Sequence, residues 1–63
     1  MAATAAASFH ATWRIGRGVQ EKAAPHRRGT IKATQGTGNN ANIIVLLTGH
    51  PPVTFHPPQL TPL

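Results

Sequence analysis

Histidine is the residue type of this sequence with the widest chemical range, because a neutral imidazole binds transition metals and exchanges protons near neutral pH. The four histidines stand at positions 10, 26, 50 and 56. His50 and His56 lie six residues apart in a proline-rich stretch, and the chain has no cysteine and a single acidic residue, Glu21. The ligands that would complete a coordination sphere are missing from this pattern, so we predict no metal site and no cofactor.

Two further patterns suggest chemistry, and their context argues against it. Ser8 lies two residues from His10, but a nucleophile and its base need a third group to orient the imidazole, and the sequence has no aspartate. Residues 36–41, GTGNNA, have the G-x-G-x-x-A spacing of a dinucleotide-binding turn, which has to follow a strand and open a helix. An apolar run with strand character follows instead. We therefore predict no catalytic residues, no nucleotide site and a protein that is not an enzyme.

The charged residues form one basic block. All seven lie between positions 14 and 32, and six of them are positive, against Glu21 alone. Such a concentration of charge attracts phosphates, anionic membranes or acidic protein surfaces. In the C-terminal half of the block we expect anion contacts from Arg27, Arg28 and Lys32. Because that half has no aromatic residue for base stacking, nucleic-acid binding is expected to be weak and non-specific.

The N-terminal segment, residues 1–22, carries a helical signal, because it is rich in alanine and contains no proline. At about 100° per residue, its side chains divide into an apolar and a basic arc. The apolar arc contains Phe9 and Trp13, and the opposite arc contains Arg14, Arg17 and Lys22. We predict an inducible helix over residues 2–15, extending up to residue 22 on a surface, since Gly16 and Gly18 fray it in water.

This segment resembles a mitochondrial presequence and, less closely, a plastid transit peptide, because it is basic, rich in alanine and free of acid before Glu21. The resemblance implies that the two arcs contact an import receptor or an anionic membrane surface. It implies a location in the mitochondrion. If the segment does not act as a targeting sequence, we expect the protein to reach both cytoplasm and nucleus by diffusion.

A continuous apolar run is the second segment with a clear signal. It consists of Ile43, Ile44, Val45, Leu46 and Leu47. β-Branched residues at its start and Gly49 after its end favour a short strand over residues 43–48. The run is far shorter than the ~20 apolar residues that cross a bilayer as a helix, so we predict no transmembrane segment. We expect these five side chains to bind a partner protein.

The remaining segments have the composition of connections. Residues 23–42 change from basic to rich in glycine and asparagine, which predicts a linker. Residues 49–63 form a proline-rich tail, in which two similar hexads begin at His50 and His56 and favour an extended polyproline II conformation over residues 50–63. We predict a mostly disordered small protein with no independent globular domain.

The function that this pattern predicts is that of a non-enzymatic, intrinsically disordered microprotein. It would regulate a larger protein by binding it through the apolar segment, with electrostatic help from the basic block. A mitochondrially targeted peptide is the alternative, and a weak, non-specific nucleic-acid binder is the third hypothesis.

Overall fold

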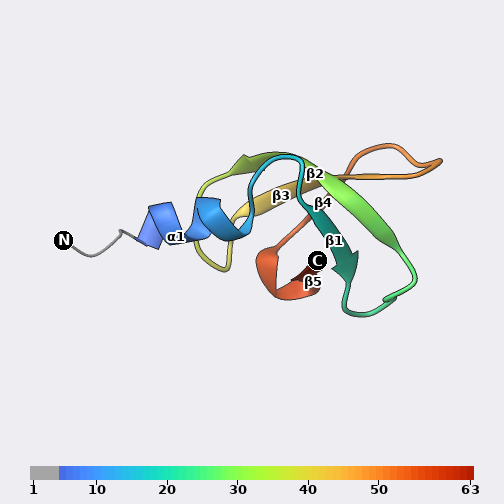
Figure 1. Cartoon of the computed structure of the whole chain (residues 1–63), viewed down its shortest axis with the longest axis horizontal. Coiled ribbons are helices and arrows are strands. Elements are labelled where there is room, and N and C mark those ends of the chain that lie inside the picture. Colours follow the sequence, from blue (N-terminus) through green and yellow to red (C-terminus); the bar gives the residue numbers. More distant parts are fainter. Residues whose placement is uncertain (1–4) are drawn as a thin grey trace.

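The structure is a computed structural model that describes residues 5–63. Within this range the chain forms a helix followed by a sheet (Figure 1). The elements are α1 (Ala5–Thr12), β1 (Gly18–Glu21), β2 (Arg28–Gln35), β3 (Asn42–Leu47), β4 (Val53–Phe55), the 3-10 helix η1 (Pro57–Gln59) and β5 (Leu60–Pro62).

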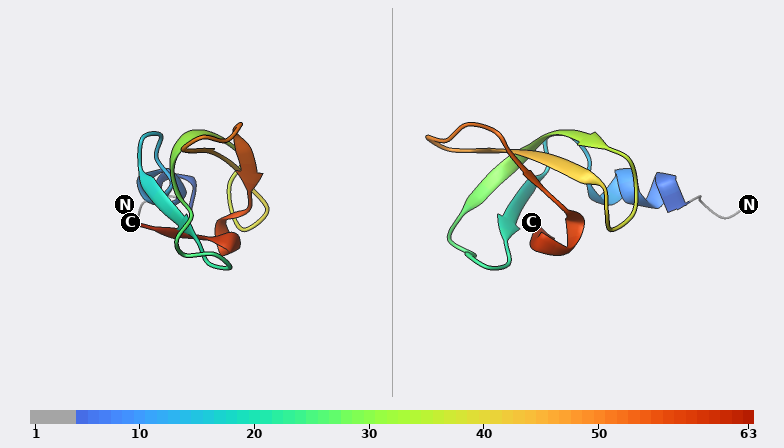
Figure 2. Two further views of the ribbon diagram at one scale, coloured as in Figure 1. Left: turned by 90° about the vertical axis from the view of Figure 1, so that its right-hand side faces the viewer. Right: turned by 180° about the vertical axis from the view of Figure 1, so that it is seen from behind.

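The five strands form one antiparallel sheet in the order β4-β3-β2-β1-β5. Viewed along the long axis of the molecule, the sheet curls around a central space, and η1 connects its two edge strands (Figure 2, left). Helix α1 projects from one end (Figure 1).

The interior of the curled sheet is the hydrophobic core, and β3 supplies its largest share. Ile43, Val45 and Leu47 alternate along β3 and are buried, as the period of two in a strand requires. Every other strand and the helix contribute to the same cluster. Its members are Phe9, Val19, Ile31, Ala41, Ile43, Val45, Leu47, Phe55 and Leu60, with Trp13 and Val53 packed against it.

Gly29 allows β2 to pass close to β3 at the inner side of the sheet. It pairs with Val19 on one side and Leu47 on the other, and both of these residues are buried. A Cβ atom on Gly29 would lie only 2.6 Å from Cγ1 of Val45 and 2.9 Å from Cδ2 of Leu47. The absence of a side chain at this position is therefore a condition for the packing of the core.

A bulge in β2 bends the sheet at Lys32. Ile31 pairs with Val45, whereas Ala33 pairs with Ile44, so Lys32 is an extra residue without its own partner on β3. Bulges of this kind bend a strand and increase its twist. The bend lets a sheet of only five short strands curl around its core.

The proline-rich tail packs as part of the domain, because Pro57 and Pro62 occupy positions that tolerate the loss of a backbone donor. Pro57 begins η1 and is buried, and Pro62 lies in the edge strand β5. His56 fixes the tail to the β2–β3 turn, since its Nδ1 lies 2.9 Å from the carbonyl oxygen of Ala41. Its backbone N–H also donates to Oε1 of Gln59 at 2.8 Å.

The prediction of a mostly disordered chain is therefore wrong, and so is the description of the protein as intrinsically disordered. Residues 28–35 are a strand rather than part of a linker, and residues 50–63 contain β4, η1 and β5 rather than a polyproline II tail. The core forms from residues distant in sequence, such as Val19, Val45 and Leu60, which no local pattern brings together.

The predicted N-terminal helix is also wrong in extent. Its first part, residues 2–4, lies outside the described residues, and α1 ends at Thr12 with a hydrogen bond from the Trp13 N–H to the Phe9 carbonyl at 2.8 Å. The chain then turns through Gly16, whose φ of +91° is not helical. Phe9 is buried in the core.

Replacing Gly29 with alanine should lower the free energy of unfolding by about 2 kcal/mol or more, because the added methyl group overlaps Val45 and Leu47. Gly18 provides the matched control on the adjacent strand, since a Cβ there meets Leu63 at an ordinary 3.7 Å. Gly18→Ala should change stability by less than about 1 kcal/mol. Urea unfolding followed by circular dichroism measures both, and equal effects would contradict the close approach at Gly29.

Replacing Ile43 with alanine should cost about 2–5 kcal/mol, because the side chain is completely buried and its loss leaves a cavity. Leu46→Ala, three positions along the same strand, should cost about 0.5 kcal/mol or less, because Leu46 faces solvent. Thermal unfolding distinguishes the two variants. The same melting temperature for both would show that β3 does not have this inward and outward alternation.

Candidate functional site

Four residues lie side by side across the outer face of the sheet. Leu46 of β3 pairs with Thr30 of β2, and Thr30 pairs with Gly18 of β1. The N–H of Leu63 donates to the carbonyl of Gly18 at 2.9 Å, and the Leu63 side chain lies beside Gly18. We call these four residues, Leu46, Thr30, Gly18 and Leu63, the outer row.

The outer row is apolar at both ends and open to solvent. Leu46 is 43% exposed and Leu63 is 54% exposed, although leucine is usually buried. Thr30 is exposed between them, and Gly18 has no side chain to interrupt the surface. The row is thus a shallow strip with apolar ends on a regular backbone, which is a suitable surface for a partner.

Two cations flank the outer row on β2. Arg28 precedes Thr30 by two residues and Lys32 follows it by two, and both are exposed. The sequence has a net charge of +5 and a single acidic residue, Glu21. Oε2 of Glu21 lies 2.8 Å from Nε of Arg27, and within residues 5–63 it forms no ion pair with Arg28 or Lys32. The surface around the outer row is therefore positive.

The structure divides the predicted partner-binding run between two faces. Ile43, Val45 and Leu47 lie in the protein's own core, Ile44 is half-buried, and Leu46 is exposed. Only the last two face outward. A partner that contacts this strand in the folded protein meets Ile44 and Leu46 rather than the whole run.

The residues predicted to contact a membrane or import surface do not share one helix. Arg14, Arg17 and Lys22 follow the end of α1, and Nη1 of Arg17 donates to the Thr12 carbonyl at 3.2 Å. Trp13 and Lys22 line a shallow groove together with Pro57, Pro58 and Pro62. The location in the mitochondrion stays a prediction, since the fold does not address it.

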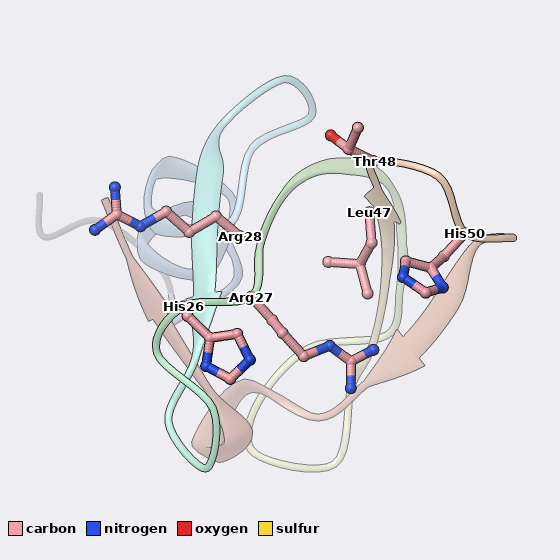
Figure 3. Close-up of a pocket in the computed structure, with 6 residues that line it drawn as sticks. All are labelled: His26, Arg27, Arg28, Leu47, Thr48 and His50. Atoms are coloured by element: carbon pink, nitrogen blue, oxygen red, sulfur yellow. The ribbon is translucent and has the colours of Figure 1, made fainter.

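A second candidate surface is a recess lined mostly by polar and basic residues, between the β1–β2 turn and the β3–β4 loop. Its volume is about 300 Å³ and it is lined by His26, Arg27, Arg28, Leu47, Thr48 and His50. In Figure 3 the guanidinium of Arg27 extends toward His50, while the side chain of Arg28 points away from the recess. Of the three predicted anion contacts, Arg27 and Arg28 thus line this recess, and Lys32 lies in the bulge near the outer row.

Glu21 holds Arg27 at the edge of this recess. Oε2 of Glu21 lies 2.8 Å from Nε of Arg27, and the side chain of Glu21 is only 12% exposed. The same oxygen accepts no aligned hydrogen bond from any described residue, so the contact is an ion pair without ideal geometry. The backbone joins the same two residues, because the Glu21 N–H donates to the Arg27 carbonyl at 3.1 Å.

Sequence reasoning missed the members of both surfaces that become neighbours only through strand pairing. Gly18, Thr30 and Leu63 gave no signal of their own, and His26 and His50 are 24 positions apart. The alternation of Arg28 and Thr30 was the one usable signal, because alternate residues of a regular strand share a face, and the bulge at Lys32 had no signal in the sequence.

In the part of the chain that the structure describes, no helix is long and apolar enough to span a membrane. Likewise, residues 5–63 contain no cluster of three or more metal-ligating side chains. No protein-family model, curated protein or solved structure matches this chain. Its function has to be inferred from the two surfaces, the outer row and the recess.

The ion pair of Glu21 and Arg27 should contribute measurably to stability. We expect a double-mutant cycle with Glu21→Gln and Arg27→Gln to give a coupling free energy of about 1 kcal/mol, near the upper end for partly exposed pairs because Glu21 is largely buried. Urea unfolding of the four proteins measures it. Additive effects of the two substitutions would show that the pair is not formed in solution.

Proposed function

We propose that this protein is a non-enzymatic binding module that engages a larger protein through the outer row and its flanking cations. The proposal rests mainly on the alignment of Leu46, Thr30 and Gly18 across three neighbouring strands, which Leu63 continues. Arg28 and Lys32 lie on β2, the middle strand of these three. The apolar ends of the row provide contact area, and the cations attract and orient the partner. The protein regulates its partner by occupying part of the partner's surface.

The proposed partner carries an apolar contact bordered by acidic side chains. Leu46 and Leu63 together expose apolar surface at the two ends of the row, and Ile44 adds a half-buried side chain next to it on β3. Arg28 and Lys32 favour carboxylates of the partner at the edge of this contact. This attraction between opposite charges increases the rate of association more than it increases the affinity. The backbone is already ordered in the sheet, so little conformational entropy is lost on binding.

A protein partner fits this face better than a nucleic acid does. Binding of single strands commonly uses aromatic side chains for base stacking. All three aromatic residues of the sequence lie elsewhere, because Phe9 and Phe55 are buried in the core and Trp13 lies in the groove beside η1. Arg28 and Lys32 alone could hold phosphates, but the leucines would then remain without a contact.

Selection of random peptides from a display library on the folded protein tests this proposal with a defined probe. Bound peptides should combine large apolar residues with Asp or Glu. Leu46→Asp should weaken their binding by about tenfold or more, because it places a charge inside the apolar contact. Thr37→Asp adds the same charge in the exposed β2–β3 turn and serves as the matched control.

Replacing both Arg28 and Lys32 with glutamine should lower the affinity several-fold and reduce its dependence on salt. Fluorescence polarisation with the selected peptides measures all variants. If the selected peptides bind the Leu46→Asp variant as tightly as the Thr37→Asp variant, the proposal is contradicted. It is also contradicted if the protein binds oligonucleotides tightly and, of these variants, only Leu46→Asp loses that binding.

A further inference from the structure

We propose that the recess between the β1–β2 turn and the β3–β4 loop is a binding site for a phosphate group, with Arg27 as its central contact. The site shares only Arg28 with the surface around the outer row, and the Arg28 side chain points away from the recess (Figure 3), so the proposal does not depend on the function proposed for the outer row. Its lining residues are His26 and Arg27 of the β1–β2 turn, Arg28 at the start of β2, Leu47 at the end of β3, and Thr48 and His50 of the β3–β4 loop.

Arg27 is held in place before any ligand binds. Its Nε is 2.8 Å from Oε2 of Glu21, its N–H donates to the Ala24 carbonyl at 2.8 Å, and its own carbonyl accepts from the Glu21 N–H at 3.1 Å. With Nε engaged, the two terminal amino groups of the guanidinium are available. This planar pair of donors matches two oxygens of a phosphate.

The other polar groups around the recess suit the same ligand. His26 and His50 belong to the two facing loops, and in Figure 3 the Arg27 guanidinium lies between their rings. Thr48 adds a hydroxyl that can donate to a phosphate oxygen. None of the six lining residues is acidic, and the carboxylate of Glu21 lies behind them, 2.8 Å from Nε of Arg27.

The size of the recess favours a small ligand. Its volume of about 300 Å³ is at the lower end of the range for small-molecule sites, sufficient for a phosphate with a short organic group. Leu47 is the one buried residue among the six and supplies an apolar side chain, whereas the other five are exposed, so the recess is open to a ligand from solvent. The ligand class is therefore a phosphate, either free or as a small monoester.

Titration of the ¹⁵N-labelled full chain with inorganic phosphate and with glycerol phosphate, at constant ionic strength, tests the site by NMR. Backbone amide shifts should concentrate at residues 26–28 and 48–50. Arg27→Gln should weaken binding by about tenfold, whereas Arg14→Gln, which removes an equal charge at an exposed position outside the recess, should weaken it by less than about twofold.

His50→Gln is the second variant, because His50 is exposed in a loop and its loss leaves the pair of Glu21 and Arg27 intact. We expect it to weaken binding by about threefold or more. Tighter binding of the ester than of inorganic phosphate identifies a monoester as the ligand, and the reverse identifies free phosphate. Equal losses in Arg27→Gln and Arg14→Gln, or shifts spread over all cations, would overturn the proposal.

Discussion

The inward-facing side chains of β3 are the constraint on which the rest of the structure depends. Ile43, Val45 and Leu47 are buried in a cluster to which β1, β2, β4, β5 and α1 all contribute. Within residues 5–63 the buried apolar side chains form this one cluster, so the stability of the described part of the chain depends on it. Because the period of a strand is two, burial of these three side chains also fixes which residues face outward, and so creates the outer row.

The local signals of the sequence could not reveal how the segments combine. The apolar run at 43–47 lies in β3, but its neighbours in the sheet come from residues that carry no strong strand pattern of their own. Gly29 looked like part of a linker, although the close approach of β2 and β3 requires a residue without a side chain there. Prolines suggested an extended tail, whereas Pro57 begins a 3-10 helix and Pro62 lies in an edge strand, two positions that tolerate proline.

The candidate surfaces show the same division between local and long-range information. Arg27, Arg28 and Lys32 were recognisable as cations from the sequence, but the bulge at Lys32 and the ion pair of Arg27 give them separate roles. Arg28 and Lys32 flank an apolar row, and Arg27 lies at a polar recess. A single basic block in the sequence thus becomes two surfaces in the fold, because a strand and a turn orient adjacent residues differently.

The most direct test of this account is the pattern of nuclear Overhauser effects between β1 and β5 in the full chain. The fold predicts cross-strand contacts from Gln20 to Thr61 and from Val19 to Pro62, residues that only the pairing of β1 with β5 brings together. A well-dispersed spectrum with these contacts would support the fold and both surfaces built on it. A narrow spectrum without them would contradict the central claim that this chain encloses its own core.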